Sequence, residues 1–232
     1  MANLFEVRNI SKRMGNFHLR NISLSVNCHE IIGIVGKNGA GKTTFLRSII
    51  GLYTNYTGEL FLNGLPFKNN SMIHKQQFAF LPESTALPGY LSMQDLGKVY
   101  KRFYRGFSTE YYQYLLEKFE FSTTKLIKDL STGNRKKLGI AMVLSSGAKI
   151  IILDEPTSNI DPISRDLIIQ ELLKFKTNNE VAVIFSSHIL YDVRKVAQKI
   201  LVLNNGKQQC FQEVPQDEEI EVFENKTLQL MR

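Results

Sequence analysis

The 232-residue chain contains only two cysteines, Cys28 and Cys210, and no tryptophan. Two cysteines are too few for a disulfide framework, so we expect the protein in a reducing compartment. No uninterrupted apolar run approaches the roughly 20 residues that span a bilayer. Charged Glu6 and Arg8 stand where a signal peptide needs its apolar stretch. These absences argue against a secreted mini-protein and against an integral membrane protein.

The composition is that of a soluble globular protein, with 43% hydrophobic and 22% charged residues. The charge balance is basic, because 29 Lys and Arg residues face 22 Asp and Glu residues and give a formal net charge of +7. A basic surface suits an anionic partner such as a nucleotide, a nucleic acid or an anionic membrane surface. Charge alone does not choose among these partners, and it is equally compatible with a basic surface that is only solvated.

Short β-like runs alternate with helical patterns along the chain, which is typical of an α/β fold with parallel strands. The stretch from Tyr90 to Tyr114 differs, because aromatic and basic residues gather there, and its pattern predicts two helices split near Gly106 with Ser108 as an N-cap. The tail from Glu213 is acidic in patches and gives no structural signal. The patterns predict strands at 4–7, 19–26, 30–35, 58–62, 78–81, 149–153, 181–185 and 200–203, and helices at 42–50, after 131, at 162–176 and after 189.

A phosphate-binding loop is predicted from Gly36 to Thr43, because Gly-Lys-Asn-Gly-Ala-Gly-Lys-Thr matches the GxxxxGK[ST] pattern without exception. The loop follows an apolar strand and opens a helix, where glycines let backbone N–H groups turn toward a phosphate and the helix N-terminus favours negative charge. Lys42 is predicted to reach the β- and γ-phosphates of ATP, and the Thr43 hydroxyl to be a ligand of Mg²⁺. The residues predicted to bind ATP in this loop are Gly36, Asn38, Gly39, Ala40, Gly41, Lys42, Thr43 and Thr44.

Two carboxylates, Asp154 and Glu155, end the apolar run Ile150–Leu153. In open α/β sheets, ligands bind beyond such carboxyl ends of strands. An Asp-Glu pair in this position is often only a solvated turn. Beside a phosphate loop, however, it predicts that Asp154 holds Mg²⁺ and that Glu155 is the general base that activates water. His188 follows the next strand at the same edge and is predicted to contact the γ-phosphate.

Between these motifs, Leu130-Ser131-Thr132-Gly133-Asn134 resembles the LSGGQ signature of ABC ATPases. The phosphate loop, this signature, Leu-Asp-Glu-Pro-Thr-Ser at Leu153–Ser158, a D-loop-like Ser158–Asp161 and His188 follow the order of that family across nearly the whole chain. The resemblance implies one ABC ATPase domain over residues 1–232, with a P-loop NTPase core at 1–83 and 146–232. That core would have a mainly parallel sheet and an antiparallel β part, and an inserted helical subdomain at 84–145 would carry the signature.

The resemblance also implies a head-to-tail dimer with ATP between the protomers, formed either by two copies of this chain or with a second ABC ATPase. In such a dimer, the signature of one protomer closes the site of the other. Ser131 and Gly133, at the start of a predicted helix, would then bind ATP across the interface, where the helix N-terminus favours the γ-phosphate.

Several positions depart from the family pattern. Thr132 replaces the first signature glycine and Asn134 replaces the glutamine, and a β-branched residue disfavours positive φ. Met14 stands where the family often places an adenine-stacking aromatic residue; Met14 is the favoured cover for the purine and Phe17 the alternative. Glu83 occupies the Q-loop position in place of glutamine, and its carboxylate is suited to binding Mg²⁺ or its waters.

This variant resembles a bacterial branch of single-domain ABC subunits that are often exporters. This resemblance implies a cytoplasmic ATPase that binds ATP and Mg²⁺. The ATPase would lie on the inner face of the cell membrane, where it is bound to a separate transmembrane permease subunit. The Tyr90–Tyr114 stretch is the predicted docking surface, although its rings would equally serve as helix–helix core. The alternative is a soluble ABC ATPase that acts on nucleic acid or ribosomes, which the Lys/Arg and aromatic mixture would also serve. A third alternative is a P-loop kinase, but this function would leave the signature-like segment unexplained.

Overall fold

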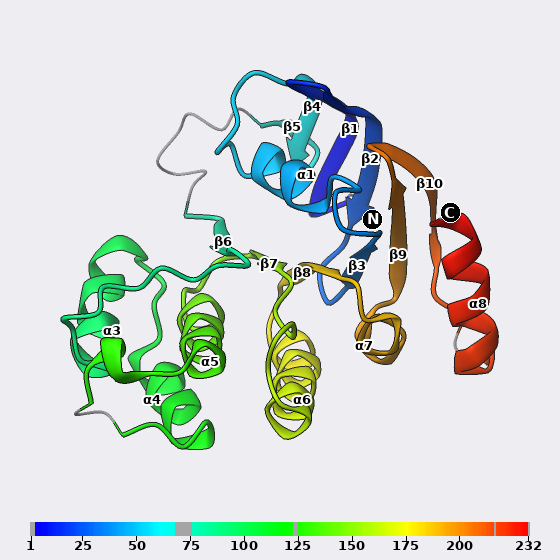
Figure 1. Ribbon diagram of the computed structural model, residues 1–232. Coiled ribbons are helices and arrows are strands. Elements are labelled where there is room, and N and C mark those ends of the chain that lie inside the picture. Colours follow the sequence, from blue (N-terminus) through cyan, green and yellow to red (C-terminus); the bar gives the residue numbers. More distant parts are fainter. Residues whose placement is uncertain (1–2, 68–75, 123–124, 216, 232) are drawn as a thin grey trace.

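The computed structural model describes residues 3–67, 76–122, 125–215 and 217–231. Within these residues, ten strands form one sheet in the order β5-β4-β1-β2-β10-β9-β3-β8-β7-β6 (Figure 1). The parallel part consists of β6 (Phe78–Leu81), β7 (Ile150–Asp154), β8 (Ala182–Ser187), β3 (Ile31–Val35) and β9 (Lys199–Asn204). The antiparallel part consists of β1 (Phe5–Met14), β2 (Phe17–Val26), β4 (Thr57–Leu62) and β5 (Leu65–Pro66).

The two parts of the sheet meet at β10 (Lys207–Glu213). This strand pairs antiparallel with β9 and parallel with β2, where Lys207 lies opposite Arg20. The central strands β3, β7 and β8 are buried along their whole length, as their nearly continuous apolar sequences predict for strands covered on both faces.

Helices cover both faces of the sheet and create two apolar cores (Figure 1). Because side chains alternate along a strand, Ile31 and Val35 of β3 point into one core and Ile32 and Ile34 into the other. Helix α1 (Lys42–Ile49) packs in the core on the side of the antiparallel part. The opposite core is covered by α5 (Thr132–Leu144), α6 (Pro162–Asn178), α7 (Leu190–Val196) and α8 (Ile220–Leu230).

Helices α3 (Met93–Phe103) and α4 (Thr109–Lys118) lie with α5 at the β6 end of the sheet, together with a short 3-10 helix at Ile127–Asp129 (Figure 1). The predicted N-cap is confirmed, because Ser108 Oγ accepts a hydrogen bond from Tyr111 N at 3.1 Å. The aromatic stretch is divided between core and surface: Phe107 and Tyr112 are buried, whereas Tyr90 and Phe103 are exposed.

The predicted α/β fold, with a mainly parallel sheet, an antiparallel β part and an added helical group, is confirmed. The sequence patterns missed β5, β10 and α8, the last of which begins in the acidic tail. Cys28 and Cys210 are both free thiols. In the described part of the chain, no helix combines the length and the apolar character that crossing a membrane requires.

Candidate functional site

The predicted phosphate loop connects β3 to α1, and glycine is required at two of its positions. Gly41 caps α1 at φ 105°, a backbone conformation open mainly to glycine, and a Cβ there would lie 2.8 Å from Phe17 Cζ. Gly36 lies behind the loop, where a Cβ would be 2.5 Å from the Leu203 carbonyl oxygen. The loop is also held from outside, since Gly206 N, in the turn between β9 and β10, donates to Ala40 O at 3.0 Å.

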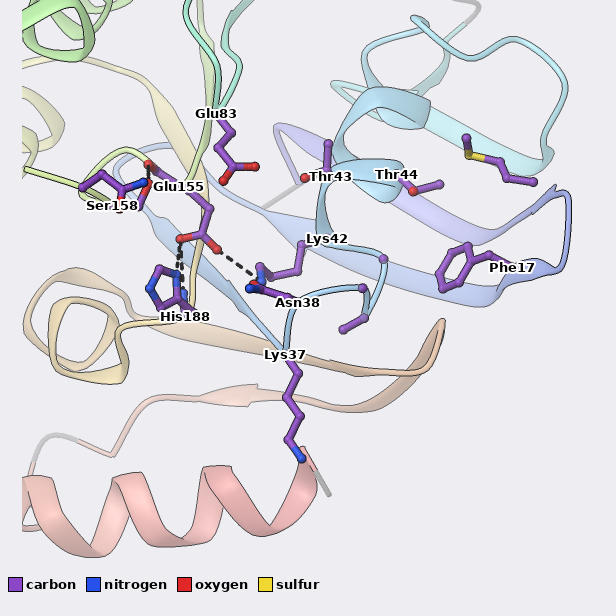
Figure 2. Close-up of a pocket in the computed structure, with 15 residues that line it drawn as sticks. Phe17, Lys37, Asn38, Lys42, Thr43, Thr44, Glu83, Glu155, Ser158 and His188 are labelled. Atoms are coloured by element: carbon purple, nitrogen blue, oxygen red, sulfur yellow. Dashed lines mark hydrogen bonds and ion pairs between the residues drawn. The ribbon is translucent and has the colours of Figure 1, made fainter. Parts of the chain in front are cut away.

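The loop forms one wall of a cavity of about 830 Å³, a volume suited to a nucleotide (Figure 2). Figure 2 shows Glu83, Glu155 and His188 on one side of the loop and Phe17 on the other. The predicted site residues that line the cavity are Met14, Asn38, Gly39, Ala40, Gly41, Lys42, Thr43, Thr44, Glu83, Glu155 and His188. Four predicted residues do not line it, namely Gly36, Asp154, Ser131 and Gly133.

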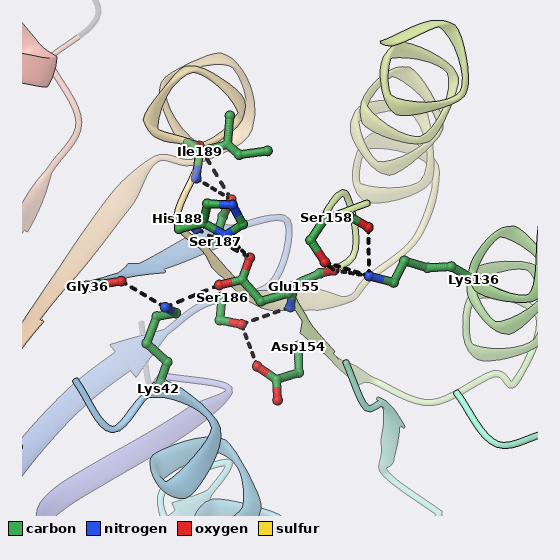
Figure 3. A network of polar contacts seen from close by, with 10 residues as sticks. All are labelled: Gly36, Lys42, Lys136, Asp154, Glu155, Ser158, Ser186, Ser187, His188 and Ile189. Atoms are coloured by element: carbon green, nitrogen blue, oxygen red, sulfur yellow. Dashed lines mark hydrogen bonds and ion pairs between the residues drawn. The ribbon is translucent and has the colours of Figure 1, made fainter. Parts of the chain in front are cut away.

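The Glu155 carboxylate joins the phosphate loop to His188 (Figure 3). Its Oε1 lies 3.2 Å from Lys42 Nζ, and its Oε2 lies 2.7 Å from His188 Nδ1. Lys42 Nζ also donates to the Gly36 carbonyl at 2.8 Å, so Gly36 contributes through its backbone. The Glu155 carboxylate, which follows β7, therefore contacts a cation at the start of α1 and an imidazole that follows β8.

Ser186, near the end of β8, links the Asp154 carboxylate to the backbone of Glu155. Its hydroxyl donates to Asp154 Oδ1 at 2.6 Å and accepts from Glu155 N at 2.9 Å. Asp154 is fully buried, and its Oδ2 has no hydrogen-bond partner among the described residues. Buried carboxylate oxygens normally have partners. A free carboxylate oxygen close to the loop therefore fits a cation ligand.

The predicted metal-binding set of Thr43, Asp154 and Glu83 consists of oxygen donors, which Mg²⁺ prefers. Thr43 and Glu83 line the cavity, and Asp154 is buried at the end of β7, next to the lining residue Glu155. No group of three or more His, Cys, Asp or Glu residues is arranged to hold a metal in the ranges that the structure describes. Three oxygen donors fit a cation whose other coordination positions are filled by phosphate oxygens and waters.

The predicted signature residues lie at the beginning of α5, outside this cavity. Ser131 is the N-cap of α5, and its Oγ accepts from Asn134 N at 3.2 Å. Gly133 faces Ile160, since a Cβ on this glycine would lie 3.3 Å from Ile160 Cγ2. The start of α5 therefore packs against the segment that follows Glu155 and turns its capping serine to solvent.

Sequence reasoning gave no site role to several residues around the cavity, although Lys37 lies in the predicted loop and Ser158 and Asn159 lie in the D-loop-like segment. Lys37, Ser158 and Asn159 line the cavity. Lys136 is buried beside it, where burial lowers the lysine pKa although nearby carboxylates act in the opposite direction. Lys37 stands at a variable position of the loop pattern, so only its place in the motif could have indicated it. At the expected purine end, Met14 and Phe17 both line the cavity, so the choice between them stays open.

A family model described as ABC transporter matches residues 19–158. The uncharacterized ABC transporter ATP-binding protein YhcH of Bacillus subtilis is 30% identical over 98% of this chain and 74% of its own length. ABC transporter ATP-binding protein YtrB of the same organism is 29% identical over 88% of this chain and 70% of its own length. Nod factor export ATP-binding protein I of Rhizobium meliloti is 27% identical, and the match covers 87% of this chain and 62% of that protein.

Solved structures share this fold. An ATP-binding subunit of an ABC transporter superposes with a TM-score of 0.85 at 21% identity, covering 97% of this chain and 99% of the other. A dimeric ATP-binding cassette in a post-hydrolysis state, bound to ADP and Pi, superposes with a TM-score of 0.78 at 22% identity, covering 91% and 99%. At these identities, the likenesses concern the fold.

Proposed function

The chain belongs to the ABC transporter family as an ATP-binding subunit, and from this premise we propose that it hydrolyses ATP to drive an exporter. In this proposal, two protomers close around ATP and act on a separate membrane subunit. The observation that carries the proposal is the single cavity in which the phosphate loop, Glu155 and His188 meet.

The catalytic roles proposed for this chain follow from the contacts of Glu155. The backbone of residues 36–44 cradles the phosphates, and Lys42 contacts the β- and γ-phosphates. Glu155 accepts a proton from the attacking water, while His188 orients the carboxylate from 2.7 Å and contacts the γ-phosphate. Mg²⁺, held by Thr43, Asp154 and Glu83, would neutralise phosphate charge when it is bound.

The dimer is proposed because the two signature residues expected to bind ATP lie outside the cavity. Ser131 and Gly133 stand at the N-terminus of α5, where backbone N–H groups and the helix dipole favour an anion. Ser131 is exposed and is therefore accessible to the ATP of a second protomer. The partner is a second copy of this chain or another ABC ATPase with a more regular signature.

The membrane subunit is proposed to dock on the helical part, residues 84–145, which would leave residues 1–83 and 146–232 as the catalytic core. Tyr90 and Phe103 support this surface, since they are 79% and 70% exposed and aromatic residues are enriched at interfaces. Docking would place the chain at the inner face of the cell membrane. Export is favoured because the name of one relative, Nod factor export ATP-binding protein I, states that direction for that protein.

The experiment that tests this function is affinity purification of tagged Glu155→Gln protein from its native cells, with ATP and mild detergent. The variant retains the ATP-binding residues but lacks the base, so it should trap the closed complex. We expect a polytopic membrane protein at near-stoichiometric yield. Recovery of ribosomal proteins or nucleic acid without a membrane protein would overturn the transporter proposal in favour of a soluble ABC ATPase.

A further inference from the structure

Lys136, in the second turn of α5, buries its ammonium group against the segment that follows β7 (Figure 3). Its Nζ donates to Glu155 O at 2.7 Å, to Ser158 O at 3.0 Å and to Ser158 Oγ at 2.7 Å. These acceptors occupy the three N–H donors that an ammonium group carries. Over the part of the chain that the structure describes, Nζ forms no ion pair, so neutral oxygens hold a buried cation.

The anchored segment includes Glu155 in an unfavourable backbone conformation. Glu155 has φ 49°, in the left-handed region that residues with a Cβ rarely adopt. Two contacts hold the peptide groups on either side of it, because Glu155 N donates to Ser186 Oγ and Glu155 O accepts from Lys136. Ser158 Oγ closes the turn by donating to Glu155 O at 3.0 Å. Lys136 and Ser186 thus hold the backbone on both sides of the Glu155 side chain.

The charge of Lys136 matters as well as its hydrogen bonds. Three carboxylates, those of Glu83, Asp154 and Glu155, act electrostatically on its ammonium group. Glu83 stands where the resemblance to ABC ATPases leads us to expect a neutral glutamine, so this chain carries one extra negative charge near the phosphate site. A buried cation beside these groups offsets part of the repulsion that an incoming polyphosphate would meet.

We propose that Lys136 is a positioning residue for hydrolysis: from α5, its ammonium group holds the Glu155–Ser158 turn so that the Glu155 carboxylate points into the cavity. This inference rests on the proposed function, because it gives Lys136 a part in the same reaction. Lys136 lies three residues after Gly133, which itself packs against Ile160. The helix that would reach the ATP of the second protomer is thereby tied to the base of its own site.

The test compares wild-type protein with Lys136→Met, Lys136→Arg and the matched control Lys137→Met. Lys137 is the next residue of the same helix, and its Nζ lies 5.8 Å from the centre of the Phe121 ring instead of reaching the Glu155 turn. Three quantities are measured: kcat and KM for ATP hydrolysis, the ATP dissociation constant, and hydrogen exchange at the amides of Glu155 and Ser158.

A positioning role predicts that Lys136→Met lowers kcat by about 100-fold, the effect of a small misplacement at a catalytic centre. The ATP dissociation constant should stay at the wild-type value, and the two amides should exchange faster. Lys136→Arg should recover about tenfold of the lost kcat, because a guanidinium keeps the charge and the donors. Lys137→Met should behave as the wild type in all three measurements.

Wild-type kcat and amide exchange in folded Lys136→Met protein would overturn the role of Lys136 alone, and so would equal losses in the Met and Arg variants. Absence of ATP hydrolysis in the wild type would instead overturn the proposed function and this inference with it. If Lys136→Met does not fold, Ser158→Ala replaces it, since this change removes one acceptor of Nζ and the hydroxyl that closes the turn. Faster exchange at Glu155 and a lower kcat are then expected, and unchanged values would overturn the proposal.

Discussion

Glu155→Gln removes a negative charge from the cavity and leaves the size of the side chain nearly unchanged. The Glu155 carboxylate is 7% exposed and contacts both Lys42 and His188. A glutamine has the same reach but cannot take a proton from water. Because a positioned general base contributes about 10²–10⁴-fold to a rate, we expect kcat to fall at least about 100-fold, which corresponds to about 2.7 kcal/mol of activation free energy.

The same substitution is expected to tighten ATP binding. The phosphates compete with Glu155 for the Lys42 ammonium group, whose Nζ lies 3.2 Å from Oε1. At an effective dielectric constant of about 20, the gross attraction over this distance is about 5 kcal/mol. Only part of this Lys42–Glu155 attraction opposes ATP binding, because Lys42 also keeps its hydrogen bond to the Gly36 carbonyl. We therefore expect a dissociation constant about tenfold lower, or about 1.4 kcal/mol.

Steady-state phosphate release measures kcat, and equilibrium titration with a fluorescent ATP analogue measures affinity. Glu171→Gln is the matched control, because Glu171 is 2% exposed and contacts Lys118 and Tyr111 from α6 instead of lining the cavity. Its kcat and ATP affinity should equal those of the wild type. Phosphate release by Glu155→Gln at the wild-type rate would refute the general-base role, and weaker ATP binding would refute the competition for Lys42.

Lys42→Ala removes the cation expected at the phosphates, so equilibrium titration should show ATP binding about 100-fold weaker, the loss of charged hydrogen bonds worth about 2.7 kcal/mol. An unchanged dissociation constant would contradict the phosphate-loop interpretation. Gly41→Ala places a Cβ at φ 105° and 2.8 Å from Phe17, so it should lower Tm more than Gly64→Ala, whose Cβ at φ 76° meets no atom within 4 Å. Equal Tm values would show that the contact with Phe17 is relieved at no cost. Burial raises the pKa of Asp192 above 3.8, so its ionised form destabilises the folded state at neutral pH. Asp192→Asn should raise the free energy of unfolding in urea at neutral pH, with a gain that vanishes as the pH falls below 3.8; a gain independent of pH would contradict this cause.

The fold class could be predicted because its evidence is local. The apolar runs of β3, β7 and β8 mark buried strands, and serines such as Ser108 and Ser131 mark helix starts within three residues of the N–H groups that they cap. β10 could not be found in this way. Its sequence Lys-Gln-Gln-Cys-Phe-Gln-Glu lacks an apolar run, and it is held by pairing with β9 and with the distant β2.

The candidate site likewise has a part that the sequence could predict and a part that it could not. The phosphate loop and the Asp154-Glu155 pair are continuous motifs, so their residues and spacing were visible in the sequence. The contacts that hold them are not local: Ser186 lies 32 residues from Asp154, and Lys136 lies 19 residues from Glu155. A lysine on a helix ordinarily predicts a solvated face, but Lys136 is buried because α5 packs against β6 and the turn that follows β7. The roles assigned to all these residues remain predictions.

The turn between β9 and β10 has a consequence for protein engineering. Surface hairpin turns usually tolerate insertions and tags, but Asn205 and Gly206 at this turn have φ values of 47° and 75°, as in a tight two-residue turn. Gly206 is buried, and its N–H holds the Ala40 carbonyl of the phosphate loop. A fluorophore or affinity tag inserted there would disturb the Gly206 contact with Ala40 and shift the phosphate loop. It would thereby change ATP affinity without contacting the cavity. For labelling purposes, this turn counts as part of the nucleotide site.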